Sequence, residues 1–373
     1  MKVASVFPTC GVLILVASFA QAAVAESWKV ISNAFTVPAE FTADYGKYKS
    51  PLVFNDGGKV TSAEDWGKRR QEILKTWESI IGSWPALIVK PSLLFINKTN
   101  RDGFVQHRVK VEIARGQTNA GYLLIPNGQP PFPAVIVPFY EPETSVGLGQ
   151  KSLRDFASQL ARRGFVALAI GSPGGNARDV PVGMPKWQPL SYLGYVAANC
   201  YNALAAIPEV DQKRIGIVGH SYGSKWAMFA SCLYEKFACA AWSDGGIVFD
   251  ETRPNVNYWE PWYLGEDTQM KRKPGAPKAD NPRTGAYKIL IERGQDLHEL
   301  HALMAPRPFL VSGGSEDPPE RWRALNHTVA VNALLGFTNR VGMTNRKTHD
   351  PTPESNEAIY AFFEYVLKER AAR

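Results

Sequence analysis

A serine lies between two glycines directly after an apolar run. Residues 219–223 read Gly-His-Ser-Tyr-Gly, and they follow the apolar run 215–218, in a strand expected at 214–218. Small and apolar residues at 224–231 then favour a helix. The two glycines let the backbone pass close behind a strained turn that exposes the hydroxyl of Ser221. This pattern predicts a nucleophilic serine rather than a plain turn between a strand and a helix.

A nucleophilic serine needs a base, and the base needs an acid that orients it. When the serine follows a strand in this way, the acid and then the histidine come later in the chain, and the histidine follows the last strand. Only His349, of six histidines, lies in a polar loop between a candidate last strand at 340–343 and a final helix at 354–370. We therefore predict that His349 is the base.

Two aspartates are candidates for the acid. Asp317 follows the apolar strand expected at 309–312, and Asp244 follows the strand expected at 238–242. We favour Asp317, because the end of the later strand is the usual location of this acid. Asp244 stays open as the alternative, as does Glu316 beside Asp317.

The oxyanion of an acyl-transfer intermediate also needs hydrogen-bond donors. The backbone N–H of Tyr222, at the start of the expected helix, is the first candidate. Phe139 and Tyr140 follow the strand expected at 134–138, and the loop after this strand commonly supplies the second N–H.

The surrounding elements alternate between strands and helices. This alternation predicts a mostly parallel central sheet with helices on both faces, the α/β-hydrolase fold. We expect strands at 105–113, 120–125, 134–138 and 166–170, and helices at 61–81, 152–163 and 191–207. Residues 26–373 then form a single domain, with an N-terminal extension at 26–100 and an insertion over the active site at about 247–300.

The first 25 residues are typical of a secretory signal peptide. Lys2 precedes an apolar stretch at 11–20, and small residues at 23–25 fit a cleavage site. We therefore expect a secreted or periplasmic protein with no membrane association after cleavage. Cys200, Cys232 and Cys239 remain in the mature chain, and their pairing stays open.

Composition argues against several other kinds of protein. Hydrophobic residues make up 45% and charged residues 21%, which is typical of a globular protein. The net charge is +7, but the basic residues are scattered apart from 271–273, which argues against nucleic-acid binding. His298 and His301 share a helix face without the further ligands of a metal site, so we expect no metal and no cofactor.

Several segments together resemble a known group of enzymes. They are Trp-Gly-Lys-Arg-Arg-Gln-Glu-Ile at 66–73, Gly-His-Ser-Tyr-Gly-Ser-Lys at 219–225, Leu-Met-Ala-Pro-Arg-Pro at 303–308, and the late His349. Over about residues 60–368 the chain resembles secreted bacterial carbohydrate esterases of the glucuronoyl esterase and acetyl xylan esterase-like group, which are related to dienelactone hydrolase-type enzymes.

The resemblance implies roles for particular residues. Ser221 matches the nucleophile, His349 the base and Asp317 the acid. Glucuronoyl esterases often carry a glutamate a short distance after the serine, and Asp244 lies there. They usually have arginine directly after the nucleophile, where this chain has Tyr222, so acetyl, feruloyl and glucuronate esters all stay open as substrates.

The expected insertion is rich in aromatic residues. Tyr258, Trp259, Trp262 and Tyr263 lie close together in it. Such side chains stack on sugar rings or aromatic acyl groups, and equally pack a loop onto a core. We predict that these four residues bind substrate.

The sequence therefore predicts a secreted serine esterase that hydrolyses a carbohydrate ester through an acyl-enzyme on Ser221. A serine peptidase of the prolyl oligopeptidase type is one alternative, although the residues before the first strand show no repeat that would build a propeller. A non-catalytic sugar-binding module with the same fold is the other. The oligomeric state stays open.

Overall fold

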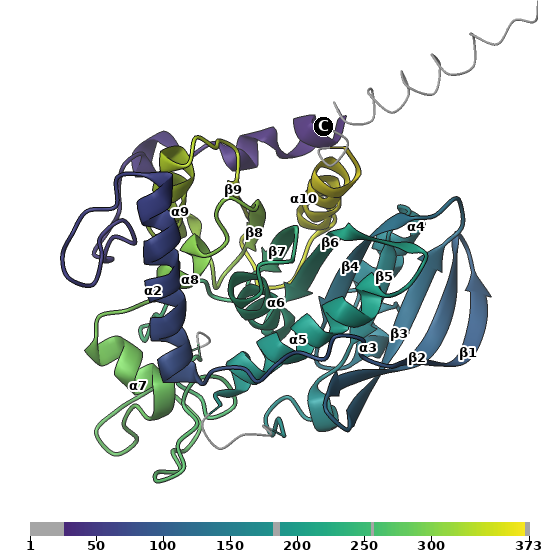
Figure 1. The fold of residues 1–373 in the computed structure, drawn as a ribbon, viewed down its shortest axis with the longest axis horizontal. Coiled ribbons are helices and arrows are strands. Elements are labelled where there is room, and N and C mark those ends of the chain that lie inside the picture. The colour runs from purple at the N-terminus through teal and green to yellow at the C-terminus, as the bar shows by residue number, and fades with distance from the viewer. Residues whose placement is uncertain (1–25, 182–186, 255–256, 370–373) are drawn as a thin grey trace, which may run out of the picture.

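The computed structural model describes residues 26–181, 187–254 and 257–369. In this part of the chain a nine-stranded sheet runs through the molecule, with helices on both of its faces (Figure 1). In spatial order the strands are β1 (Leu93–Arg101), β2 (Phe104–Ala114), β3 (Gln117–Pro126), β5 (Val166–Ile170), β4 (Phe132–Pro138), β6 (Val210–His220), β7 (Cys239–Ser243), β8 (Phe309–Gly313) and β9 (Val341–Asn345).

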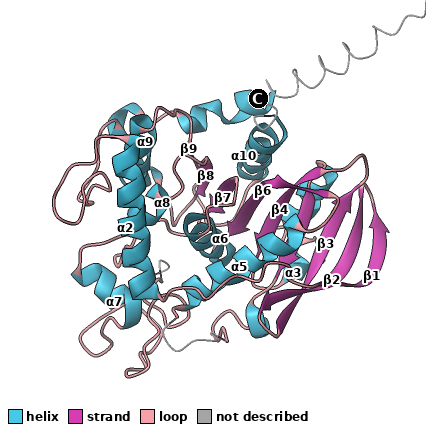
Figure 2. Ribbon diagram, in the orientation of Figure 1, coloured by secondary structure: helices cyan, strands magenta, loops and turns pink. Residues whose placement is uncertain are grey.

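The sheet changes character along its width. From β5 to β9 all neighbouring strands are parallel, whereas β1, β2, β3 and β5 pair antiparallel. Strands β4, β5, β7 and β8 are buried at every residue, as expected for parallel strands covered on both faces. The antiparallel strands project at one side of the molecule, where Figure 2 shows them as long magenta arrows.

The described residues form helices of different length. They are α2 (Ala63–Ile81), α3 (Pro142–Ser145), α4 (Phe156–Arg162), α5 (Pro189–Ala205), α6 (Tyr222–Leu233), α7 (Gly285–Glu292), α8 (His298–Ala302), α9 (Trp322–Leu334) and α10 (Pro353–Phe363), which continues as a π-helical segment at Glu364–Glu369. Adjacent strand residues point into separate cores. Ile217 belongs to the core that includes residues of α2, α5 and α6, whereas Val218 belongs to the core that includes residues of α4 and α10.

The expected α/β-hydrolase architecture is confirmed, with differences at particular elements. Helix α2 begins where its capping residue predicts, because the Ser62 hydroxyl accepts the backbone N–H of Asp65 at 3.1 Å. Helix α4 begins only at Phe156. Strand β1, at the edge of the sheet, is not among the strands expected from the sequence, and all of it except Arg101 lies in the segment assigned to the N-terminal extension.

The predicted signal peptide, residues 1–25, lies outside the part of the chain that the structure describes. Among the described residues, no helix is both long and apolar enough to cross a membrane.

Cys200, Cys232 and Cys239 are buried free thiols. Between residue 26 and β1 the structure has short helices and α2 but no strand longer than an isolated bridge, so the peptidase alternative gains no propeller from this segment.

Candidate active site

The turn between β6 and α6 holds Ser221 in an unusual backbone conformation. Its φ is 56° and its ψ is −116°, a combination that a non-glycine residue rarely adopts. A Cβ atom on Gly219 would lie 2.1 Å from the carbonyl oxygen of Gly223, and one on Gly223 would lie 2.2 Å from that of Pro138. Both glycines are therefore required by close backbone contacts, which present the serine side chain at the end of the sheet.

Three side chains form a hydrogen-bonded series at this point. The Nε2 atom of His349 lies 2.9 Å from the Oγ atom of Ser221, and its Nδ1 atom lies 2.8 Å from Oδ2 of Asp244. The His349 side chain is 37% exposed, whereas Asp244 is completely buried. The geometry is that of a nucleophile, a base and an orienting acid.

Asp244 is fixed by the neighbouring loop. Its Oδ1 atom accepts the backbone N–H groups of Glu316 and Asp317 at 3.1 and 3.0 Å. Its own backbone has a positive φ of 50°. One carboxylate oxygen is thus engaged by the loop after β8, and the other is left to face His349.

The structure corrects our preference for Asp317 as the acid that orients His349. The Asp317 carboxylate accepts the backbone N–H groups of Gly246 and Ile247, at 2.9 and 2.6 Å. Burial, and after it the nearby charge of Asp244, raise the pKa of Asp317 to about 6, although the two backbone hydrogen bonds lower it. Although its position after β8 is the expected one, its side chain turns toward the loop after β7.

The expected oxyanion donors differ in availability. Tyr222 is the first residue of α6, where a backbone N–H has no acceptor within the helix. The backbone N–H of Phe139 instead donates to the carbonyl of Ile170 at 3.0 Å, so the expectation for Phe139 is corrected. Tyr140 remains, and its side chain stacks on Tyr222 with ring centroids 4.7 Å apart.

The Tyr140 side chain lines the same cavity as the nucleophile. Burial raises the pKa of its hydroxyl, while contacts with Ser221 and Tyr263 lower it. The sequence pattern points only to the backbone N–H of Tyr140. The hydroxyl is therefore an additional polar group in the cavity of Ser221, and it has no signal in the sequence.

A cavity of about 390 Å³ opens beside Ser221. Its walls come from the loops after β4, β7, β8 and β9, from α6, and from the segment between β7 and α7. The lining residues are Tyr140, Ser221, Lys225, Asp244, Pro254, Asn257, Tyr263, Glu316 and His349. This cavity is the candidate substrate site.

The four aromatic residues expected to bind substrate are not equivalent. Tyr263 lines the cavity. Tyr258 and Trp259 are completely buried, and the Tyr258 hydroxyl donates to the carbonyl of Gly246. Trp262 is partly buried, with the guanidinium of Arg178 5.5 Å from its ring centre. For Tyr258 and Trp259 the structure favours packing over substrate contact.

Lys225 is a cavity residue that is not among the site residues predicted from the sequence. Its ammonium group donates to the carbonyl of Gly245 and lies 4.9 and 5.5 Å from the ring centres of Tyr258 and Tyr263. Burial lowers its pKa, whereas nearby carboxylates raise it, Glu316 most of all. The available signal was its spacing: it lies four residues after Ser221, one helical turn further along the same face.

The two neighbouring histidines of α8 are core residues. The Nε2 atom of His298 lies 2.7 Å from the carbonyl oxygen of Lys49, and burial lowers the pKa of His298 to about 3. His301 is buried beside Trp242. No group of acidic, histidine and cysteine side chains in the described ranges has the arrangement of a metal site.

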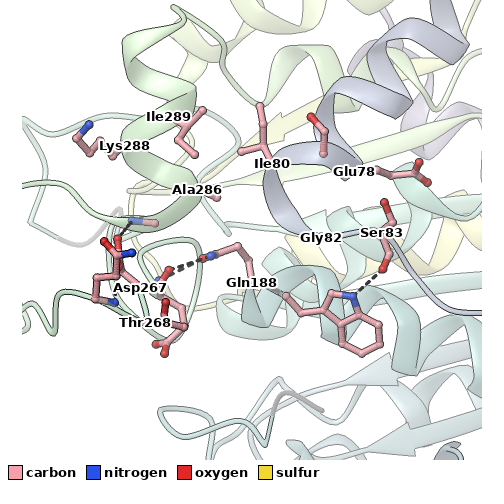
Figure 3. A pocket seen from close by; sticks show the side chains of 15 residues that line it. Glu78, Ile80, Gly82, Ser83, Gln188, Asp267, Thr268, Ala286, Lys288 and Ile289 are labelled. Carbon is pink, nitrogen blue, oxygen red and sulfur yellow. Dashed lines mark hydrogen bonds between the residues drawn. The ribbon is translucent and has the colours of Figure 1, made fainter. Parts of the chain in front are cut away.

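A larger hollow of about 900 Å³ lies elsewhere, between the end of α2 and the start of α7 (Figure 3). Gln188 and Glu266 exchange side-chain and backbone hydrogen bonds across it. Asp267 accepts the N–H of Gly285 at 3.3 Å, which ties its loop to α7. Neither Ser221 nor His349 lines this hollow, so it is separate from the candidate active site.

Comparison with known proteins agrees with this fold. Residues 95–252 match the protein family described as Esterase FrsA-like. The structure is similar to a glucuronoyl esterase from Solibacter usitatus, with a TM-score of 0.66 and 19% identity over 88% of this chain and 99% of that one. The protein has the α/β-hydrolase fold.

Two further structures are similar. One is a promiscuous CE15 esterase from the marine bacterial metagenome, with a TM-score of 0.64 and 18% identity over 89% of this chain and 100% of that one. The other is a putative acetyl xylan esterase from Bacteroides fragilis NCTC 9343, with a TM-score of 0.55 and 16% identity over 88% of each chain. No curated protein matches this chain. The expected resemblance to this group is confirmed at the level of the fold.

The two aspartates should respond differently to mutation. Asp244→Asn should lower kcat by about 10⁴-fold, because an amide favours the wrong tautomer of His349. Asp317→Asn should lower kcat much less but should destabilise the fold, because an amide cannot accept two backbone N–H groups in the same way. Ester hydrolysis and thermal unfolding of both variants measure this. A crippled Asp317→Asn enzyme beside an active Asp244→Asn enzyme would contradict the geometry.

The two tryptophans of the aromatic segment should also differ in how much their loss destabilises the fold. Trp259→Ala should reduce the free energy of unfolding by about 3–5 kcal/mol, because it empties a completely buried site. Trp262→Ala, at a partly buried position, should cost far less. Chemical denaturation of the two variants provides the measurement, and equal losses would show that the two rings carry similar packing.

Proposed function

We propose that this protein is a secreted serine esterase that hydrolyses a carbohydrate ester. The observation that carries the proposal is the series Ser221–His349–Asp244, with hydrogen-bond distances of 2.9 and 2.8 Å at the edge of a cavity. The strained serine turn supports it, because such strain is retained where it presents a nucleophile.

Acylation starts with the serine hydroxyl. The Oγ atom of Ser221 attacks the ester carbonyl carbon while Nε2 of His349 accepts its proton. Asp244 holds Nδ1–H of His349 and stabilises the imidazolium that forms. When the tetrahedral intermediate collapses, the bond to the alcohol oxygen breaks, and His349 passes its proton to that oxygen. The alcohol leaves, and the acyl group stays on Ser221.

Deacylation repeats these steps with water. His349 takes a proton from water as the water oxygen attacks the acyl carbon. The bond to Ser221 then breaks, the serine oxygen recovers the proton from His349, and the carboxylic acid is released. Both halves of the reaction use only these side chains and backbone donors, so the proposed chemistry requires no cofactor.

The oxyanion needs donors near the attacked carbonyl. The backbone N–H of Tyr222 is one, supported by its place at the start of α6. We propose that Tyr140 supplies the second donor. Both its side-chain hydroxyl and its backbone N–H, in the loop after β4, are candidates. The commitment of the Phe139 N–H to Ile170 favours Tyr140 for this role.

The carbohydrate substrate is inferred from the fold resemblance and from the cavity. Similar structures include proteins described as glucuronoyl esterases and as a putative acetyl xylan esterase. The cavity combines an aromatic side chain, Tyr263, with polar groups such as Asn257 and Lys225. Export is proposed from the leader-like residues 1–25 and fits a polymeric substrate outside the cell.

The esterase proposal is tested with Ser221→Ala and His349→Ala. Each variant should lower kcat by at least about 10³-fold on acetyl, feruloyl and methyl glucuronate esters, because the triad acts as a unit. A fluorophosphonate should label the wild-type protein at Ser221 and should fail to label Ser221→Ala. Ser315→Ala, in the loop after β8, serves as the control. A folded wild-type protein that does not label, or that hydrolyses no ester, would reject the proposal.

The contribution of Tyr140 can be isolated by removing one oxygen. Tyr140→Phe keeps the ring that stacks on Tyr222 but lacks the hydroxyl beside Ser221. We expect kcat to fall by about 10²-fold with little change in KM, since the lost donor acts mainly in the transition state. Tyr45→Phe is the control, because Tyr45 is an exposed tyrosine that does not line the cavity. If kcat survives Tyr140→Phe unchanged, the hydroxyl has no part in the chemistry.

A further inference from the structure

A buried carboxylate lines the candidate substrate cavity without an assigned role. Glu316 precedes Asp317 in the loop after β8, and only 3% of its surface is exposed. It belongs to the same cavity wall as Ser221 and His349. The triad does not use this side chain, because Nδ1 of His349 contacts Asp244 instead.

One oxygen of this carboxylate lacks a hydrogen bond within the protein. The Oε2 atom of Glu316 is buried and has no partner among the described residues. The other oxygen, Oε1, lies 3.9 Å from Nη2 of Arg253, which is beyond hydrogen-bond distance. A buried acceptor left in this state is costly, since a charged group loses its hydration without replacement.

The surrounding charges favour a neutral donor as its partner. The ammonium group of Lys225 lines the same cavity and interacts electrostatically with Glu316. Arg253 adds a second positive charge near the Glu316 carboxylate. A cationic ligand would meet these two charges, and an anionic one would meet the carboxylates of Glu316 and Asp244. A hydroxyl group satisfies the acceptor without adding charge.

We propose that the Glu316 carboxylate binds a hydroxyl group of the substrate next to the ester that Ser221 attacks. The ligand class is a polyol ester, that is, an ester whose sugar ring carries a free hydroxyl within reach of the cavity wall. This inference rests on the proposed esterase function and makes Glu316 a specificity residue of that site. An ester without hydroxyl groups gains nothing from this contact.

The test compares substrates with and without hydroxyls. We would measure kcat and KM for methyl glucuronate, acetylated xylotriose and p-nitrophenyl acetate with wild type, Glu316→Gln and Glu316→Ala. For the sugar ester that wild type hydrolyses best, Glu316→Ala should lower kcat/KM by about 10- to 100-fold, the effect of one hydrogen bond to a charged group. Glu316→Gln, which keeps an acceptor oxygen, should lose less. The loss on p-nitrophenyl acetate should be much smaller.

Glu260 provides a matched control. It is another buried glutamate, 5% exposed, whose Oε2 also lacks a hydrogen bond among the described residues. Its carboxylate lies 3.6 Å from the buried guanidinium of Arg272 and does not line the cavity. Glu260→Gln should therefore leave the ratio of kcat/KM between sugar ester and p-nitrophenyl acetate unchanged.

A binding experiment separates this inference from the proposed function. Calorimetric titration of Ser221→Ala with methyl glucuronate and with acetylated xylotriose should show that adding Glu316→Ala weakens binding of the preferred ester. Thermal unfolding of each variant confirms that it is folded. Three outcomes would overturn the inference. The first is an equal loss of kcat/KM on all esters, and the second is the same change in the kcat/KM ratio for Glu260→Gln. The third is a wild type that binds and hydrolyses only p-nitrophenyl acetate. A wild-type protein that binds a sugar ester through Glu316 but never labels at Ser221 would instead reject the esterase proposal alone.

Discussion

Two buried aspartates hold together the loops that carry the candidate site. Asp244, after β7, accepts two backbone N–H groups from the loop after β8, and Asp317, after β8, accepts two from the loop after β7. Each carboxylate thus fixes the backbone from which the other one projects. Because β7 and β8 are parallel neighbours, both loops leave the same edge of the sheet, and this exchange of hydrogen bonds is geometrically available there.

The loop after β9 joins the same arrangement through Arg346. Its guanidinium donates to the carbonyl oxygens of Ser312, at the end of β8, and of His349. Gly314 permits the close approach of the loops, since a Cβ there would lie 2.7 Å from the Asp244 carboxylate and 2.3 Å from the carbonyl oxygen of Thr348. The distance between His349 and Asp244 is therefore set by three loops rather than by two side chains.

Features with a local cause could be predicted from the sequence. The glycines around Ser221 reflect backbone contacts within a few residues, and apolar runs mark strands that are covered on both faces. The choice between Asp244 and Asp317 has no such local signal, because each follows a parallel strand and each lies beside glycines or turn residues. The backbone N–H groups of a distant loop decide which carboxylate faces His349. A distant group also decides the outcome for Phe139. Its backbone N–H donates to the carbonyl of Ile170 on the neighbouring strand, so it is not available to an oxyanion.

Other differences have their own physical reasons. Strand β1 is exposed at most positions, so it lacks the alternation that reveals a half-buried strand. Trp259 is completely buried although its neighbour Trp262 is not, and aromatic composition alone cannot separate packing from binding. Residue type alone is equally insufficient for Glu316, for which the sequence suggests only the role of an orienting acid beside Asp317. In the structure Glu316 is buried against the cavity, and its Oε2 atom has no hydrogen bond within the described part of the chain. This combination of burial, cavity position and an unused acceptor is the basis for proposing that a substrate hydroxyl binds there.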